Sequence, residues 1–274
     1  MSRHLPIVAA LVVAACTPPT SAPAPTSTST STSTSTSTST STTAATPTPP
    51  DPIRAAIDAS DRLPSDRALD AGRHPVELLT FLGVAPGQRI AEIGSYTGYM
   101  ADLLGRIVAP SGQVYAQDPQ KLVEMTHDAW AARKDSPAMK TIVRVARPFD
   151  DPLPPDVTGL DAVVVGLFYH DMVWLKVDRA KLNAAAFRAL KSGGVYFVYD
   201  HSARAGAGVD DAKKIHRIEE SVVRKEIEAA GFKLAATSDF LRHPEDKRDW
   251  DASDEGPKDK RGTSDRFILK YVKP

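Results

Sequence analysis

The sequence has little of three features that would define common functional classes. It contains one cysteine, Cys16, which excludes an intramolecular disulfide, an iron–sulfur cluster and a zinc site built from thiolates. Positive charge is not in excess, because 34 Lys and Arg residues balance 34 Asp and Glu residues, and this argues against a dedicated nucleic-acid-binding protein. The longest apolar stretch, residues 5–15, is too short to cross a bilayer as a helix, which excludes a polytopic membrane protein.

The start of the chain has the pattern of a secretion signal. A short basic segment, residues 1–4, precedes the apolar stretch, which ends in Val-Ala-Ala-Cys at residues 13–16. This ending resembles the lipobox of bacterial lipoproteins, in which small residues precede the cleavage point and the cysteine carries a lipid. The resemblance implies a signal peptide over residues 1–15 and an extracytoplasmic protein anchored to a membrane through a lipid on Cys16. Thr17 in place of Asp implies the outer membrane in a cell that has one.

A low-complexity segment separates this signal from the rest of the chain. Residues 16–50 are almost entirely Thr, Ser, Pro and Ala, and they offer no apolar surface to offset the entropy lost on ordering. We therefore predict a disordered tether. The alternative, a buried N-terminal helix with an incidental cysteine, would leave that helix nothing to pack against. Residues 51–274 hold every aromatic residue and are sufficient for one α/β domain.

Helical and strand patterns alternate after residue 51. Helices are expected within residues 51–82 and at residues 99–108, 121–134, 179–190 and 218–230. Strands are expected at residues 89–93, 113–117, 141–145, 162–167, 195–199, 232–237 and 266–272. This order predicts a doubly wound α/β fold with a mostly parallel sheet covered on both faces.

The turn after the first expected strand is the most informative segment. Gly94 and Gly98 lie between that strand and a helix, where glycines let a ligand approach the backbone and its amide groups. Two glycines do not complete the dinucleotide motif, so a pyrophosphate ligand is poorly supported. Glu92 at the end of the strand suits a cationic amine, and Asp118 at the end of the next strand is placed to take two ribose hydroxyls. This arrangement predicts an S-adenosyl ligand; the alternative is that both carboxylates cap loops.

At these residues the chain resembles a known superfamily. Residues 91–99, AEIGSYTGY, look like motif I of class I S-adenosylmethionine-dependent methyltransferases, and residues 190–195, LKSGGV, resemble the turn before their fifth strand. Residues 70–75, 168–171, 200–203, 216–218 and 229–232 are similar to a group of bacterial, often exported, predicted methyltransferases. The resemblance implies the Rossmann-like methyltransferase fold, with seven strands and a C-terminal antiparallel pair. It also implies S-adenosyl-L-methionine as cofactor, bound by Glu92, Gly94, Ser95, Gly98, Tyr99 and Asp118.

Two positions depart from common patterns of the superfamily. Tyr96 stands where many methyltransferases have the middle glycine of motif I, although catechol-type O-methyltransferases show a similar EIGTYTGY turn. Those enzymes also use a metal-binding Asp after the fourth strand, whereas this chain has Gly-Leu-Phe at residues 166–168. No metal is therefore assigned to the site.

Two pairs of His and Asp residues follow the fourth and fifth expected strands, at the edge where ligands bind in doubly wound sheets. His170 is the first candidate for a general base and His201 the second, with Asp171 or Asp200 orienting the imidazole. Tyr169 is a candidate for shaping the acceptor pocket or contacting the sulfonium through its ring. The alternatives are that the Asp residues cap turns and the His residues are structural. A further alternative is a zinc or iron site that includes His216, although no tight His spacing supports it.

Two further segments lie near the expected site. Phe149 could stack on an adenine ring, and Asp150 follows it after the third strand. The charged stretch at residues 242–265 has its simplest interpretation as a solvated loop, and the alternative is a lid over the acceptor.

These observations predict methyl transfer from S-adenosylmethionine to an O or N atom of a small-molecule acceptor. The enzyme would act outside the cytoplasm on a lipid anchor, with no nucleic-acid partner. The rival hypothesis is a non-catalytic extracytoplasmic module that binds a small molecule on the same fold. A third, repair of isoaspartyl residues in envelope proteins, rests only on the similar glycine turn.

Overall fold

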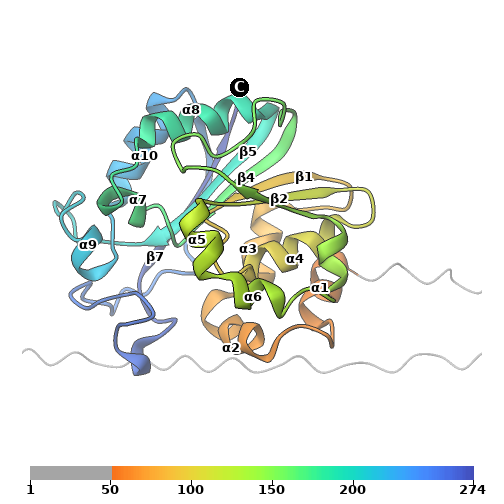
Figure 1. The fold of residues 1–274 in the computed structure, drawn as a ribbon. Coiled ribbons are helices and arrows are strands. Elements are labelled where there is room, and N and C mark those ends of the chain that lie inside the picture. Colours follow the sequence, from red (N-terminus) through yellow and green to blue (C-terminus); the bar gives the residue numbers. More distant parts are fainter. Residues whose placement is uncertain (1–50) are drawn as a thin grey trace, which may run out of the picture. The chain divides into compact units, whose positions relative to one another are not determined.

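A computed structural model describes residues 51–274, in which seven strands form one mixed sheet (Figure 1). The sheet order is β3-β2-β1-β4-β5-β7-β6. Strands β1 to β5 are parallel, and β7 lies antiparallel between β5 and β6. The strands are β1 (Arg89–Ile93), β2 (Gln113–Asp118), β3 (Ile142–Ala146), β4 (Leu160–Gly166), β5 (Leu190–His201), β6 (Lys233–Ser238) and β7 (Arg266–Val272). The predicted fold class is confirmed.

The N-terminal predictions concern another part of the chain. The signal peptide over residues 1–15, the tether over residues 16–50 and the lipid on Cys16 all lie outside the described residues.

Helices cover both faces of the sheet (Figure 1). One face packs against α1 (Pro52–Asp58), α3 (Pro75–Leu82) and α4 (Tyr99–Val108), and the other packs against α8 (Arg179–Ala189) and α10 (Glu220–Ala229). The remaining helices are α2 (Pro64–Arg73), α5 (Gln120–Met125), α6 (His127–Ala131), α7 (Asp171–Trp174) and α9 (Ala212–Ile215), with 3₁₀ turns at Pro137–Lys140 and Lys258–Lys260. Between residues 51 and 274, no helix has both the length and the apolar character to span a bilayer.

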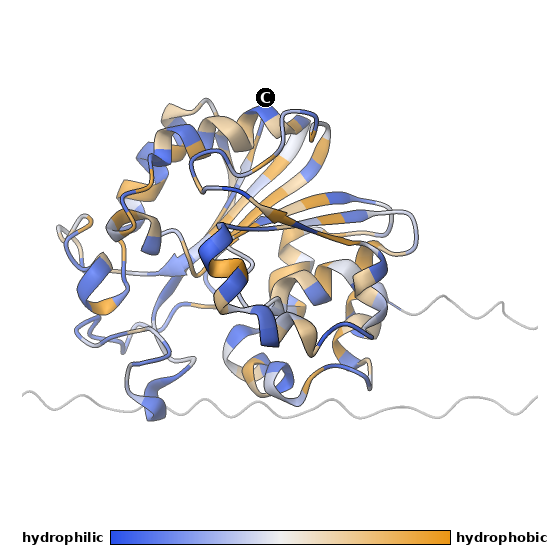
Figure 2. Ribbon diagram, viewed as in Figure 1, coloured by the Kyte–Doolittle hydropathy of each residue, from blue (hydrophilic) through white to orange (hydrophobic). Residues whose placement is uncertain are grey.

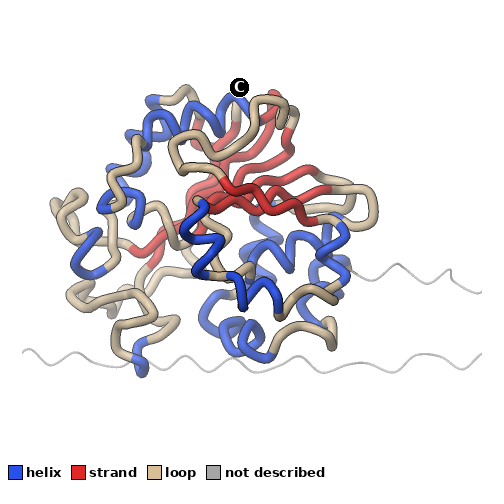
Figure 3. Tube along the Cα trace, in the orientation of Figure 1, coloured by secondary structure: helices blue, strands red, loops and turns tan. Residues whose placement is uncertain are grey.

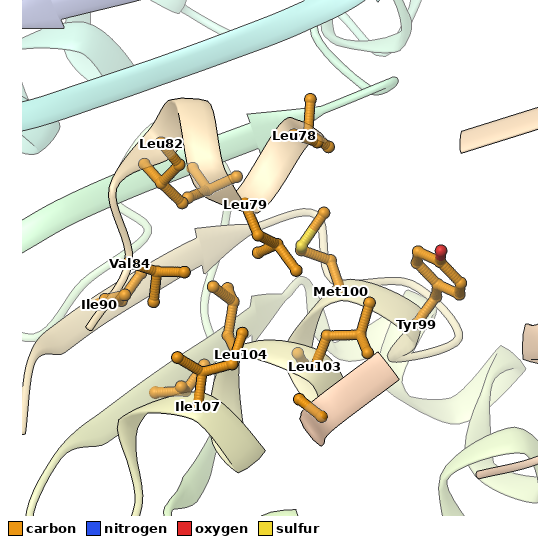
Figure 4. Close-up of a cluster of buried hydrophobic side chains, with 14 of the residues drawn as sticks. Leu78, Leu79, Leu82, Val84, Ile90, Tyr99, Met100, Leu103, Leu104 and Ile107 are labelled. Carbon is orange, nitrogen blue, oxygen red and sulfur yellow. The ribbon is translucent and has the colours of Figure 1, made fainter. Parts of the chain in front are cut away.

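The central strands are apolar on both faces because each face has its own layer of helices. In β4, Ala162 and Val164 belong to the cluster on the α4 side, and Val163 and Val165 belong to the cluster on the α8 side. Figure 4 shows part of the first cluster, where leucines of α3 and α4 meet Ile90 of β1. This two-sided burial explains why the strand reads as a continuous apolar run in the sequence.

Proline fixes the start of each of the first three helices. Pro52, Pro64 and Pro75 occupy the first helical turn, where a missing backbone N–H costs nothing. His74, in the left-handed region with φ of 49°, ends α2 and reverses the chain into α3. Arg73, the last residue of α2, is thereby held beside the sheet edge.

One helix differs from the sequence-based expectation. The helix expected at residues 121–134 is interrupted at Thr126, whose hydroxyl donates to the carbonyl of Leu122 at 2.8 Å. The connection from β3 to β4, residues 147–159, contains no helix.

The charged stretch before β7 is a mostly hydrophilic loop with one short 3₁₀ turn (Figures 2 and 3), but part of it is held by buried polar contacts. The carboxylate of Asp246 accepts hydrogen bonds from the guanidinium of Arg217 at 2.9 Å and the indole of Trp250 at 2.7 Å. It also accepts from the backbone N–H of Asp265 at 2.7 Å. The side chains of Arg217 and Asp246 are almost completely buried, at 0% and 1% exposure. Polar contacts therefore order this segment where apolar residues are few.

We expect Asp246→Ala to lower the free energy of unfolding by about 3–5 kcal/mol, because it leaves the buried Arg217 guanidinium without its counter-charge. Urea denaturation measures this change. Asp249→Ala is the matched control, since Asp249 lies exposed in the same segment, and it should change the free energy by less than about 0.5 kcal/mol. Equal, small effects of the two substitutions would restore the interpretation as a solvated loop.

Candidate functional site

A cavity of about 930 Å³ opens at the carboxyl ends of the parallel strands. It lies where β1 and β4 are neighbours but their connections leave in opposite directions along the sheet, the topological switch point at which doubly wound folds bind ligands. Its walls come from Arg73, the turn after β1, helix α5, the β3–β4 connection, the ends of β4 and β5, and residues 252–255.

The cavity brings together most of the residues predicted from the sequence. Those that line it are Glu92, Gly94, Ser95, Tyr99, Phe149, Asp150, His170, Asp171 and His201. The other three, Gly98, Asp118 and Tyr169, are not part of its wall.

The glycine turn is closely packed, and its first two amides are bonded to the neighbouring strand. Gly94 has φ of 74°, and a Cβ there would lie 2.8 Å from the ring of Phe168, so only glycine fits. The backbone N–H groups of Gly94 and Ser95 donate to the carbonyl of Gln117 at 2.9 and 3.2 Å. These amides face the β2 strand end and not a ligand. Gly98 packs against Trp130 and keeps the turn tight.

Asp118 supports this turn from behind. Its carboxylate is completely buried and accepts from the Ser95 hydroxyl at 2.7 Å and the Tyr96 N–H at 3.1 Å. Arg144 donates to it at 3.2 Å. Burial raises the pKa of Asp118 to about 6 despite these partners. The expectation that Asp118 faces two ribose hydroxyls is not met, because both of its oxygens are engaged within the fold.

Glu92 differs from Asp118 in its hydrogen bonding. It is buried, and its Oε2 atom has no hydrogen-bond partner among residues 51–274. Burial, followed by the nearby charge of Asp118, raises the pKa of Glu92 well above its usual range. An unpartnered carboxyl on a cavity wall costs free energy unless a ligand satisfies it.

Arg73 is a functional candidate that sequence reasoning missed. Its guanidinium stacks 4.4 Å from the ring centre of Tyr99, and it takes part in no ion pair formed within residues 51–274. The hydroxyl of Tyr99 donates to Asp70 at 2.8 Å, which fixes the ring beneath the cation. The Arg73 charge acts to lower the pKa of Glu92, and both residues line the cavity. The only sequence signal was the resemblance of residues 70–75, which carried no role for Arg73.

Phe149 and Asp150 lie on the wall formed by the β3–β4 connection. The Phe149 ring packs against Phe168 with ring centres 5.1 Å apart and planes tilted by 45°. Together the two rings form an apolar wall beside the glycine turn.

A buried carboxylate organises the histidines. Asp200 accepts hydrogen bonds from the backbone N–H of His170 at 2.8 Å and of His201 at 2.8 Å. The Nδ1 atom of His170 lies 2.7 Å from Asp200, and its Nε2 atom lies 3.1 Å from Asp171. Both ring nitrogens of His170 are thus held between carboxylates.

This geometry changes the roles expected of the two histidines. Burial opposes the charge on His170, but Asp200 and Asp171 outweigh it and raise the pKa of His170 to about 10. His170 is therefore an imidazolium at neutral pH and is not available as a general base. Burial and the charge of His170 lower the pKa of His201 well below its usual range. His201 is a neutral imidazole on the cavity wall, with Nδ1 2.8 Å from the Ser264 hydroxyl.

His216 completes the group without forming a metal site. Its Nδ1 lies 2.8 Å from Asp251, and its ring centre lies 5.5 Å from that of His170. Within residues 51–274, no set of three or more His, Cys, Asp or Glu side chains is arranged to hold a metal ion. The pairing of His216 with Asp251 ties the segment before β7 to the cavity wall, so this segment adjoins the site as the lid interpretation required.

Tyr169 does not reach the cavity, contrary to expectation. It is completely buried, and its hydroxyl donates to Glu226 at 2.9 Å and accepts from Asn183 at 2.9 Å. These partners lie on α10 and α8, so Tyr169 holds helices to the sheet and contacts no ligand.

Comparisons with known proteins identify the fold. No protein-family model and no curated protein sequence matches the chain. A SAM-dependent methyltransferase from Aquifex aeolicus superposes with a TM-score of 0.55 at 17% identity, over 82% of this chain and 99% of that chain. The [4+2]-cyclase SpnF superposes with a TM-score of 0.52 at 17% identity, over 77% of this chain and 81% of that chain. The chain therefore has the class I SAM-dependent methyltransferase fold.

We expect the His170 ring to remain protonated through neutral pH and to titrate near pH 10, because two carboxylates stabilise its charge. Folding raises this pKa, so its contribution to the free energy of unfolding is complete below about pH 6.5 and is lost as pH rises through 10. NMR of the ring carbons across this range measures the titration. Asp200→Asn should lower the midpoint, and a wild-type midpoint below neutral pH would contradict the assignment.

Proposed function

We propose that the chain is an S-adenosyl-L-methionine-dependent methyltransferase that acts on an O or N atom of a small molecule. One observation carries the proposal. At the switch point of a methyltransferase fold, Glu92 and Arg73 line one cavity, and neither the Oε2 atom of Glu92 nor the Arg73 guanidinium has a polar partner within residues 51–274. The two groups are complementary to the ammonium and carboxylate of an amino acid. S-adenosylmethionine carries such an amino-acid group at one end, whereas a nucleotide does not.

The donor fits the described residues as follows. Glu92 would accept hydrogen bonds from the ammonium group, and Arg73 would bind the carboxylate with its planar fork. The aromatic wall of Phe149, with Asp150 beside it, would hold the adenine. Asp118 contributes indirectly, because it fixes the turn that carries Ser95 and Tyr96.

S-adenosylmethionine, when bound, supplies an electrophilic methyl group on a sulfonium. The chain must then align the acceptor and remove its proton. His201 is suited to take this proton because it is neutral and lies on the cavity wall. His170 acts as a positioning residue: clamped by Asp171 and Asp200, it holds the ends of β4 and β5 together next to His201.

The alternative of a non-catalytic binding module is less well supported. A neutral imidazole is maintained on the wall of the same cavity by a buried network, which simple ligand binding would not need. Because SpnF uses the same fold and is a [4+2]-cyclase, the fold alone does not decide the reaction. No residue of this site adds support to the hypothesis of isoaspartyl repair.

We further propose that the enzyme acts outside the cytoplasm, anchored by a lipid on Cys16. The support is the resemblance of residues 13–16 to a lipobox and the Ser/Thr-rich segment that follows. Such a tether would let the domain reach acceptors near the membrane, and no nucleic-acid partner is expected.

The proposed function can be tested by measuring whether a proton is released when a donor analogue binds. We expect the full-length chain to bind S-adenosylhomocysteine with micromolar affinity and to release a proton near neutral pH, because the ligand's ammonium lowers the raised pKa of Glu92. Calorimetry in buffers of different ionisation enthalpy measures the release. Glu92→Gln should abolish it, and Arg73→Met should weaken binding by about tenfold or more.

Arg67→Met is the matched control for this experiment, because Arg67 lies exposed on the same helix and outside the cavity. It should leave the affinity unchanged. The absence of binding at millimolar ligand, from a folded sample, would overturn the proposed function.

A further inference from the structure

The mouth of the cavity is rimmed by large apolar side chains that nothing within residues 51–274 covers. Tyr96, Met125, Trp174 and Leu175 are 43%, 67%, 39% and 42% exposed, and all four line the cavity. They come from three separate segments: the turn after β1, the end of α5 and the end of α7. Among the described residues, Val143 on β3 is the one other large apolar side chain of comparable exposure, at 40%. Exposed apolar surface gathered around a cavity indicates a ligand with an apolar body.

Trp174 connects this rim to the histidines. Its indole N–H donates to Asp171 at 2.8 Å, and Asp171 in turn lies 3.1 Å from Nε2 of His170. The indole is therefore fixed in orientation and not merely exposed. A flat aromatic ring placed against it would gain offset or edge contacts that an aliphatic chain cannot make.

The surroundings of His201 indicate which kind of acceptor group would react there. Burial lowers the pKa of His201 most, followed by the charge of His170, whose ring centre lies 5.7 Å away, and then by the charges of Arg266 and Arg217. An ammonium group held against His201 would meet the like charge of His170, whereas an oxyanion developing at that point would be stabilised. A weakly basic imidazole also transfers a proton efficiently only from an acidic hydroxyl, and a phenol, with a pKa of about 10, is far more acidic than an aliphatic alcohol.

We propose that the acceptor is a phenol, whose aromatic ring lies against the rim at Trp174 and whose hydroxyl donates a hydrogen bond to His201. This inference rests on the proposed function and names the substrate class for the same site. In the reaction, the phenol oxygen bonds to the methyl carbon as the bond from that carbon to the sulfonium sulfur breaks. The sulfur keeps the electron pair, and the proton passes to His201 and then to solvent. The products are an aryl methyl ether and S-adenosylhomocysteine.

The test measures binding without turnover. The full-length chain, saturated with S-adenosylhomocysteine, is titrated by calorimetry with phenol, with anisole and with cyclohexanol. We expect the phenol to bind best and the methyl ether to bind several-fold more weakly, because it cannot donate to His201. His201→Ala should remove that difference. Trp174→Ala should weaken phenol binding by about tenfold, whereas Val143→Ala should have no effect.

A second arm distinguishes the source of the phenol. N-acetyl-tyrosinamide and a tyrosine-containing tripeptide replace phenol itself, and their tighter binding would assign the phenol group to a tyrosyl side chain and not to a free small molecule. Either source supports the inference. Equal binding of cyclohexanol and phenol, or no phenol binding to a chain that binds S-adenosylhomocysteine, would overturn the inference alone. Failure of S-adenosylhomocysteine itself to bind would overturn the proposed function and the inference with it.

Discussion

The site depends on one buried carboxylate, that of Asp200 at the end of β5. It accepts hydrogen bonds from the backbone of the segment after β4 and from its own strand end, and it contacts the imidazole of His170. Because Asp200 is completely buried, its charge must be satisfied inside the protein, and His170 supplies the counter-charge. Burial keeps His201 neutral, and the neighbouring imidazolium of this pair adds to the effect because it opposes a second positive charge.

Ionisable side chains in this protein fall into two groups with different consequences. Asp118, Asp200 and Asp246 have protein donors on their oxygens and hold turns, strand ends and the segment before β7 in place. Glu92 and Arg73 lack such partners within residues 51–274, and both face the cavity. The three aspartates stabilise the segments around the cavity. Glu92 and Arg73 determine which ligand the cavity can bind.

The elements with strong local signals were predictable from the sequence. The helix at residues 99–108 and the strand at residues 89–93 have the expected bounds, because apolar periodicity and the flanking glycines define both. The burial of Asp118 and the protonation of His170 were not predictable, since each depends on a partner more than twenty residues away. Tyr169 was misplaced for a related reason: sequence adjacency to His170 does not determine which side of the sheet a side chain faces.

A crystal structure of the full-length chain with S-adenosylhomocysteine tests the central claim most directly. The account predicts the ligand's amino group within hydrogen-bond distance of Glu92 and its carboxylate paired with Arg73, with the sulfur directed toward His201. An amino-acid moiety bound away from both Glu92 and Arg73 would contradict the account, as would a ligand seated outside the cavity.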